Sequence, residues 1–346
     1  MARRARGDEE TLAFLRRGEA HPEPGARVEV VETHFAWVFC GPRTVRKLRK
    51  PIRTAHFDLT TPDRREAASR EEVRLNSVLA PDVYLGVEPM VRTAAGGLAL
   101  DGAGTPVDWL VVMRRLPAAA ALDERNPRGP EALEHLVDLL ADYYRRAPRA
   151  ADASTAWAGR IAAMLDALEG RVAASAVGGG AALARRLGRW ARREAALLDE
   201  RAAAGRVVDG HGDLRPEHVY LTSPPRVLDR LDFDAELRRV DWLEDLALLA
   251  VDLERLGRPW IASALTRALG ARLDDPPPAV LGRFYRAWRG LLRAQLCLEH
   301  RTRPGRLGAA GWLSRAKAYL SIAERHAALM EALRDRPGRG GRDRAV

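Results

Sequence analysis

The stretch 207–254 constrains the fold of this 346-residue chain more than any other part of the sequence. Within it, two short runs, 219–221 and 226–228, flank a Thr-Ser-Pro-Pro segment, which predicts a small hairpin with a proline-bearing turn. Because a hairpin brings its ends together, the polar side chains at its two ends should face one small volume. Carboxylates this close repel one another, which costs free energy unless a cation or a proton lies among the carboxylates and imidazoles. The polar residues are His211, Asp213, Glu217 and His218 before the hairpin and Asp229, Asp232 and Asp234 after it.

The first third of the chain has the pattern of a β-sheet with one helix. Thr61 is placed to cap that helix, which we expect at 62–80 with Val73, Leu75, Val78 and Leu79 facing the sheet. Alternating apolar residues predict strands at 28–32, 35–40, 44–48, 85–91, 98–101 and 109–113.

From residue 130 onward the apolar residues recur with a helical period. Strands first and helices afterwards indicate an α+β fold with two lobes, not alternating βαβ units. We expect an N-lobe at 1–116 with an antiparallel sheet and one helix, a mostly helical C-lobe at 117–334, and a disordered tail at 335–346. The expected helices lie at 131–146, 155–170, 181–204 and 242–256, with three or four more after them.

Composition excludes several classes of protein. No run of 18 apolar residues and no apolar leader is present, so we expect neither a membrane span nor secretion. Cys40 and Cys297 lie far apart in the sequence, which favours a reduced, cytoplasmic setting. The net charge of +10 arises from arginines spread over all the helices without interleaved aromatics, so we expect no nucleic-acid partner. The oligomeric state does not follow from the sequence.

Lysine is rare in this chain, and only Lys47, Lys50 and Lys317 occur. Where arginine replaces lysine almost everywhere, a retained lysine is a candidate for a role that arginine cannot fill. Lys47 alternates with Val45 on one face of the strand at 44–48. It is therefore a candidate functional residue, and the alternative is an ordinary solvated lysine.

The sequence His-Gly-Asp-Leu-Arg-Pro-Glu-His at 211–218, the Asp after the hairpin and the Asp-Leu-Ala at 245–247 form one recognisable set. They resemble the catalytic segment of the aminoglycoside phosphotransferase and protein-kinase-like superfamily, most of all an uncharacterised bacterial branch of the aminoglycoside phosphotransferase family. The resemblance implies a protein-kinase-like fold. It also implies an ATP-dependent phosphotransferase that uses Mg²⁺ and moves the γ-phosphate to a hydroxyl of a small molecule.

The resemblance gives roles to residues on both sides of the hairpin. Asp213 matches the catalytic aspartate, which accepts a proton from the substrate hydroxyl or orients it. His211 would support the loop, and Arg215 would contact a transferring or substrate phosphate. Asp229 matches the aspartate that holds Mg²⁺.

The resemblance also assigns residues in the strand-rich part of the chain. Lys47 matches the strand lysine that contacts the α- and β-phosphates of ATP. Glu72 matches the helix glutamate that pairs with this lysine, and Glu71 is the alternative. Met113 and Arg115 lie in the segment that matches the hinge, where backbone groups read the edge of the adenine.

His218 departs from the family pattern, which has a metal-binding asparagine at this position. Imidazole nitrogen suits Mn²⁺ or Zn²⁺ better than Mg²⁺. Four interpretations stay open: the second metal site is lost, His218 binds Mn²⁺ in place of Mg²⁺, Glu217 replaces it as the ligand, or His218 bonds to Asp213 or Asp229 and binds no metal.

Three other functions stay open at this point. The chain could be a binding or regulatory protein with a kinase fold and no catalysis, as His218 and the glycine-free turn at 32–34 suggest. The cluster of His and Asp could belong to a metal-dependent hydrolase. A kinase fold could also transfer AMP instead of a phosphate.

Overall fold

The computed structural model of the chain describes residues 2–17, 27–100, 102–123, 131–149, 156–173, 178–300 and 307–334. It divides into two compact units. The first comprises Met1–Ala120 and Arg226–Asp234, and the second comprises Ala121–Pro225 and Ala235–Val346. The second strand of the hairpin and the residues up to Asp234 thus group with the N-terminal sheet. The boundary expected at 116/117 stays a prediction, and the tail expected at 335–346 lies outside the described residues.

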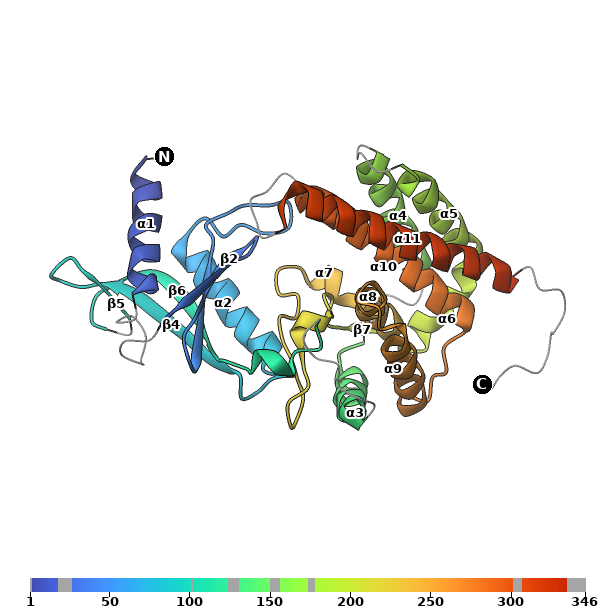
Figure 1. Cartoon of the computed structure of the whole chain (residues 1–346), viewed down its shortest axis with the longest axis horizontal. Helices are drawn as coiled ribbons and strands as arrows, with labels where there is room; N and C mark the ends of the chain where they lie inside the picture. Colours follow the sequence, from blue (N-terminus) through green and yellow to red (C-terminus); the bar gives the residue numbers. More distant parts are fainter. Residues whose placement is uncertain are drawn as a thin grey trace. The chain divides into compact units, whose positions relative to one another are not determined.

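The first unit is built on an antiparallel sheet, with strands at all six predicted positions (Figure 1). Its six strands within the described residues follow the order β1-β2-β3-β6-β4-β5. β3 is internal, because it pairs with β2 on one side and with β6 on the other. The strands are β1 (Glu29–Glu32), β2 (Ala36–Cys40), β3 (Thr44–Arg49), β4 (Tyr84–Arg92), β5 (Leu98–Leu100) and β6 (Thr105–Arg114).

The two faces of this sheet carry different side chains. Leu48 and Leu110 are register partners and pack with Leu15 of helix α1 (Ala2–Arg16) in an apolar cluster. One residue earlier in β3, Lys47 is the partner of Val111, which belongs to a second cluster with Tyr84. Because side chains alternate along a strand, Lys47 and Val111 point to the face opposite α1.

Helix α2 (Pro62–Asn76) packs against β4 and β6. Its start is confirmed, because the Thr61 side chain accepts a hydrogen bond from the Arg64 N–H at 3.4 Å and a proline occupies the first turn. The helix ends four residues before the predicted residue 80, and Val78 is 59% exposed instead of facing the sheet. The prediction for Val78 was wrong because α2 ends at Asn76, so Val78 lies in the turn after the helix and not on its buried face. That face is largely polar, with Arg65, Ser69, Glu72 and Asn76 beside Leu75.

The second unit is mostly helical, and its short strand β7 (Val207–Asp209) pairs with β10 (Arg239–Asp241). The helix expected at 181–204 is interrupted at Glu194, which separates α5 from α6. Of the short strands expected around the Thr-Ser-Pro-Pro segment, β8 (Val219–Tyr220) belongs to this unit and β9 (Arg226–Val227) to the first. The helices are α3 (Glu131–Arg146), α4 (Trp157–Ala173), α5 (Gly180–Arg193), α6 (Ala195–Ala203), α7 (Ala235–Arg238), α8 (Trp242–Arg255), α9 (Pro259–Arg272), α10 (Ala279–His300) and α11 (Gly308–Arg334).

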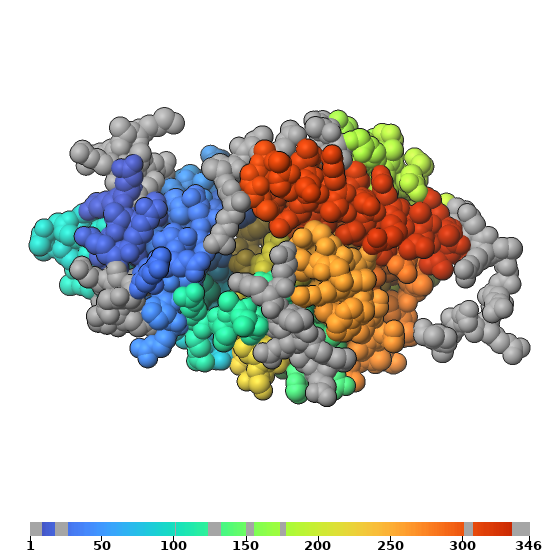
Figure 2. Space-filling model, in the orientation of Figure 1, coloured from blue at the N-terminus to red at the C-terminus, as the bar shows by residue number. Residues whose placement is uncertain are grey.

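Helix α8 is the centre of this unit, because every residue from Trp242 to Leu253 is buried. The long helices α10 and α11 pack along each other and against α8, and α11 forms the red surface in Figure 2. Large aromatic side chains fill the core, among them Trp157, Trp242, Trp288, Tyr285 and Tyr319. In the part of the chain that the structure describes, none of the helices has the length and apolar character needed to cross a membrane.

Candidate active site

Lys47 lies between two carboxylates of the first unit. Its Nζ donates to Glu72 Oε1 at 2.8 Å and to Asp229 Oδ1 at 2.9 Å. Glu72 is 1% exposed, whereas the Asp229 side chain is 50% exposed. Burial alone would lower the pKa of Lys47, but the charges of Asp229 and Glu72 outweigh it and raise that pKa above its ordinary value. Lys47 is therefore a fixed cation beside a carboxylate that solvent reaches.

The choice between the two adjacent glutamates follows from the geometry of α2. Successive residues on a helix point about 100° apart, so Glu71 and Glu72 cannot both face the sheet. Glu72 contacts Lys47, whereas Glu71 pairs with Arg74 one turn along the outer face, with oxygen–nitrogen distances of 2.6 and 2.7 Å. Of the two candidates, Glu72 is the partner of Lys47.

Arg49 is a second cation in this network, and the sequence analysis missed it. Its guanidinium donates to Glu72 Oε2 at 2.6 Å, to the Ala68 carbonyl at 3.3 Å, and to Asp232. The Arg49 side chain is 6% exposed and Asp232 is 12% exposed. Arg49 follows Lys47 by two residues, so the period of a strand directs both side chains to the same face. That spacing was the signal that could have identified it.

The segment that carries Asp229 is held by hydrogen bonds that its N–H groups donate to side chains of the sheet and of α2. Asp229 has φ 58°, a left-handed conformation uncommon for a residue with a side chain. Its N–H donates to the Tyr84 hydroxyl at 3.2 Å, and the next N–H, of Arg230, donates to Asn76 Oδ1 at 2.8 Å. These bonds hold the backbone turn that directs the Asp229 carboxylate to Lys47.

In the second unit, Asp245 at the start of α8 holds the loop that contains Asp213. Its carboxylate accepts the His211 N–H at 2.6 Å and the Gly212 N–H at 3.0 Å, and it also accepts the Tyr144 hydroxyl at 3.0 Å. Gly212 has φ 81°, which glycine adopts without strain. The Asp-Leu-Ala motif thus has a physical role here, because its aspartate fixes the backbone of the loop.

His211 is completely buried, and its ring is part of the loop. Its Nδ1 accepts the Asp213 N–H at 3.3 Å, so its proton resides on Nε2. The Asp213 carboxylate is 36% exposed. The buried histidine and Asp245 therefore hold the backbone around Asp213, while the Asp213 side chain remains accessible to solvent.

His218 and Arg215 both make contacts inside the second unit. His218 Nδ1 donates to the Asp213 carbonyl at 2.9 Å and lies 4.0 Å from its carboxylate. Arg215 donates from Nε to Asp252 at 3.3 Å and forms an ion pair with Glu217. Because Asp252 and Glu217 both contact Arg215, they use part of its hydrogen-bonding capacity. The Arg215 side chain is 19% exposed.

The predicted metal residues are consistent with a cation that also binds phosphates. Among the described residues, no group of three or more His, Cys, Asp or Glu side chains could hold a metal by itself. Mg²⁺ is usually bound by one or two carboxylates together with substrate phosphates, and the half-exposed Asp229 carboxylate fits that donor set. His218 belongs to the other unit, and its Nδ1 proton is directed at a backbone carbonyl.

Met113 and Arg115 are integrated into the first unit. Met113 packs against the cluster of Ala80, Val83 and Val111. The N–H of Arg115 donates to the Arg43 carbonyl at 2.7 Å, and its guanidinium donates to the Gly41 carbonyl at 2.8 Å. The side chain of Arg115 thus ties the end of β6 to the turn between β2 and β3, and its contact with adenine stays a prediction.

A scan against protein-family models finds no match. The chain is 32% identical over 293 residues to uncharacterized proteins of Mycobacterium tuberculosis and Mycobacterium bovis. The alignment covers 80% of this chain and 56% of those proteins, so the chain spans little more than half the length of the curated relatives it matches.

Two solved structures share the fold. A choline/ethanolamine kinase family protein from Mesorhizobium loti has a TM-score of 0.50 and 17% identity, covering 94% of this chain and 99% of that one. A choline kinase from Cryptosporidium parvum has a TM-score of 0.54 and 9% identity, covering 94% and 97% respectively. The predicted fold class is thereby confirmed: the chain has a kinase-like α+β fold, with an antiparallel sheet and a helix followed by a mostly helical part.

Proposed function

We propose that this protein is an ATP-dependent phosphotransferase that acts on a hydroxyl of a small molecule. The observation that carries the proposal is the contact of Lys47 with both Glu72 and Asp229. A partly buried lysine fixed by a helix glutamate, next to a half-exposed carboxylate, is the arrangement that phosphoryl transfer requires on the nucleotide side. The reaction needs positioning and charge neutralisation more than covalent chemistry.

Each residue on the nucleotide side has a separate task. Lys47 binds the α- and β-phosphates, and Glu72 holds its ammonium group in one position through the 2.8 Å contact. Asp229 binds the metal ion, Mg²⁺ or Mn²⁺. When bound, that ion neutralises charge on the phosphates. Backbone groups near Met113 and Arg115 contact the adenine edge.

Asp213 works on the acceptor side. Its exposed carboxylate orients the substrate hydroxyl and accepts its proton as the phosphate is transferred. His211 and His218 act through it, since both bond to the Asp213 backbone. Arg215 contacts a phosphate after partial release from Glu217 and Asp252. The solved structures with this fold are named for choline and ethanolamine, which agrees with a small hydroxylated acceptor.

Thermal-shift titration with ATP tests the proposal, with Mg²⁺ and Mn²⁺ in separate series. ATP at about 100 times its Kd should add roughly 2.7 kcal/mol to the free energy of unfolding. We expect this shift in the wild type, and we expect Asp229→Asn and Glu72→Gln to lose most of it. A shift larger with Mn²⁺ than with Mg²⁺ that His218→Asn reverses would assign His218 as a ligand.

Glu71→Gln is the matched control, because Glu71 is the adjacent residue, carries the same charge and contacts Arg74 instead of Lys47. It should bind ATP like the wild type. No metal-dependent shift in the wild type, or an equal loss in both glutamine variants, would reject the proposed nucleotide site. Hydrolysis of a simple phosphoester with metal and without nucleotide would favour a metallohydrolase instead.

A further inference from the structure

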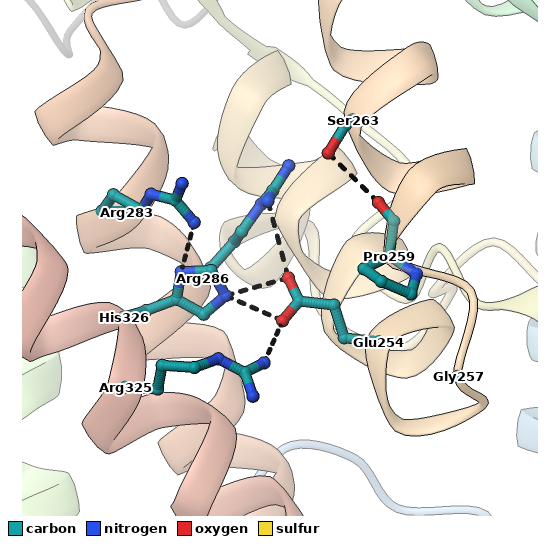
Figure 3. A pocket seen from close by; sticks show the side chains of 8 residues that line it. All are labelled: Glu254, Gly257, Pro259, Ser263, Arg283, Arg286, Arg325 and His326. Atoms are coloured by element: carbon teal, nitrogen blue, oxygen red, sulfur yellow. Dashed lines mark hydrogen bonds and ion pairs between the residues drawn. The ribbon is translucent and has the colours of Figure 1, made fainter.

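The second unit contains a cavity of about 460 Å³, and none of the residues 211–218 lines it. It is lined by the end of α8, the start of α9, and side chains of α10 and α11 (Figure 3). Glu254 on α8 is nine residues beyond Asp245, or about 13 Å of helix at 1.5 Å per residue. The residues that carry charge or a hydroxyl are Glu254, Ser263, Arg283, Arg286, Arg325 and His326.

The protonation state of His326 follows from its two contacts. Arg283 Nη1 donates to His326 Nδ1 at 3.2 Å, so the ring proton must reside on Nε2. His326 Nε2 then donates to the two Glu254 oxygens, at 2.8 and 2.9 Å. Burial lowers the pKa of His326 and outweighs the opposing influence of Glu254, so the ring is neutral at pH 7. His326 therefore adds no charge to the cavity.

The remaining charges do not balance. Glu254 supplies one negative charge, and Figure 3 shows Arg286 and Arg325 directed at its carboxylate. The shortest nitrogen–oxygen distances are 3.5 Å from Arg286 and 2.5 Å from Arg325. Arg283 is a third cation, directed at the His326 ring. Among the described residues that line the cavity, the three positive charges of the guanidinium groups are thus opposed by a single carboxylate, which only Arg286 and Arg325 of the three contact.

Arg286 shows the effect of this imbalance most clearly. Its side chain is 12% exposed, yet its contact with Glu254 is long, and its other bond is to the neutral hydroxyl of Thr266 at 3.1 Å. Burial lowers the pKa of Arg286, the nearby Arg283 lowers it further, and Glu254 opposes both only in part. A buried cation with a weak counter-ion gains free energy when an anion approaches.

We propose that this cavity binds the phosphate group of a small organic phosphate. Guanidinium groups bond to phosphate oxygens in pairs, and the two excess positive charges match a phosphate dianion. The volume lies in the range of small-molecule sites, which leaves room for an organic moiety beside the phosphate. Ser263 is exposed on the first turns of α9, and its hydroxyl, which donates to the Pro259 carbonyl at 3.1 Å, would have to exchange that bond to contact the phosphate.

Calorimetric titration with inorganic phosphate tests the site, with chloride at matched ionic strength as the blank. We expect saturable binding to the wild type and about tenfold weaker binding, or more, to Arg283→Gln, since a hydrogen bond to a charged group is lost. Arg325→Gln should weaken binding in the same direction. Because the Arg325 side chain is 55% exposed, this variant remains informative if Arg283→Gln fails to fold.

Two further variants test whether positive charge drives phosphate binding and whether the phosphate binds in this cavity. Glu254→Gln removes the competing carboxylate and should bind phosphate more tightly than the wild type. Arg189→Gln is the matched control, because Arg189 is an exposed arginine of α5 outside the cavity, and it should bind phosphate like the wild type. Circular dichroism and melting temperature verify the fold of each variant.

The outcomes separate this site from the proposed nucleotide site. Phosphate binding that Lys47→Met abolishes and that Arg283→Gln and Arg325→Gln leave intact would overturn the proposal, since the anion would then occupy the nucleotide site. Equal weakening by Arg189→Gln would also overturn it, because it would indicate attraction by the net charge alone. Absence of binding to the wild type would reject the site and leave the proposed phosphotransferase activity unaffected.

Discussion

Each unit of the protein contains a cluster of charged side chains. The two clusters differ in whether one of their carboxylates is open to solvent. The closed cluster consists of Arg201, Asp241 and Asp275 in the second unit. Arg201 donates to the two oxygens of Asp241 at 2.7 and 2.8 Å and to Asp275 at 2.8 Å. The open cluster consists of Lys47, Arg49, Glu72, Asp229 and Asp232 in the first unit.

In the closed cluster the carboxylates have further donors inside the core. Asp241 is completely buried and also accepts the Leu243 N–H at 2.9 Å, which caps α8, and the Tyr285 hydroxyl at 3.3 Å. Asp275 accepts the Trp242 ring N–H at 2.7 Å. In the open cluster Glu72 is equally enclosed, but the Asp229 side chain is half exposed.

The comparison suggests a criterion that separates a structural cluster from a ligand-binding one. The criterion is whether solvent reaches one of the carboxylates of the cluster. Both clusters remove charges from water, which is costly unless each charge is paired and hydrogen-bonded. The fully buried Asp241 and the nearly buried Arg201 and Asp275 make the closed cluster a part of the core. The exposed carboxylate of the open cluster leaves a place where a ligand can complete the set. Two of the following three changes test this distinction directly, and the third concerns a carboxylate outside both clusters.

The largest expected effect is on the closed cluster. Arg201→Met leaves the fully buried Asp241 without its cation, so we expect the free energy of unfolding to fall by about 3–5 kcal/mol. Urea denaturation measures it. Arg206→Met is the control, because the Arg206 side chain is 30% exposed and lies 3.5 Å from Asp275, and it should cost less than about 1 kcal/mol. Similar losses in the two variants would mean that enclosure does not set the energy of the cluster.

Lys47→Met should show the opposite pattern. Arg49 still holds Glu72 at 2.6 Å, so the free energy of unfolding should fall by only about 1–2 kcal/mol. ATP affinity in the presence of Mg²⁺ should fall about tenfold to hundredfold, because a hydrogen bond to a charged phosphate is lost. Urea denaturation and ATP titration on the same preparation measure both quantities. If the variant is as unstable as Arg201→Met and binds ATP normally, the open cluster is structural and the comparison fails.

The smallest expected effect concerns a carboxylate near the surface that belongs to neither cluster. The Thr60 hydroxyl donates to Asp58 at 2.6 Å, and this bond, followed by the Thr60 N–H at 3.0 Å and the charge of Arg64, lowers the pKa of Asp58 to about 2. Thr60→Val should raise that pKa towards the ordinary value of about 3.9. A carbon-detected NMR titration measures it.

The pH dependence of Asp58 has a definite sign. Because its pKa is lower in the folded state, it stabilises the protein above pH of about 4, and this contribution is lost as the pH falls towards 2. Thr60→Val should remove part of that dependence. An unchanged Asp58 pKa in the variant would show that the backbone N–H at position 60 and Arg64, and not the Thr60 hydroxyl, lower it.

The parts of the fold that local patterns determine were predictable from the sequence. Strand alternation identified the six strands of the sheet, and Thr61 with Pro62 identified the start of α2. Motifs identified Lys47, Glu72, Asp213 and Asp229 as candidates, and the structure brings Lys47, Glu72 and Asp229 into contact. Their roles stay predictions.

The parts that depend on distant pairing were not predictable. Arg49 and Asp232 are 183 residues apart, and no pattern in one sequence reports such a contact. The same holds for Asp245, whose contacts lie 33 and 34 residues earlier in the chain. Val78 was assigned to the buried face because it is apolar and the helix was expected to reach residue 80, whereas α2 ends at Asn76 and Val78 lies in the turn after it.

Helix α8 has a consequence for how the length of this protein can vary. It carries Asp245, which bonds to the loop around Asp213, Asp252, which bonds to Arg215, and Glu254, which lines the cavity. Inserting a single residue between Asp245 and Asp252 would rotate everything after it by about 100° relative to everything before it. Since α8 is buried on all sides, no neighbouring helix could follow that rotation. We therefore expect no insertion or deletion to be tolerated in this segment. The number of residues between Asp245 and Asp252 is constrained as strictly as the identity of the side chains.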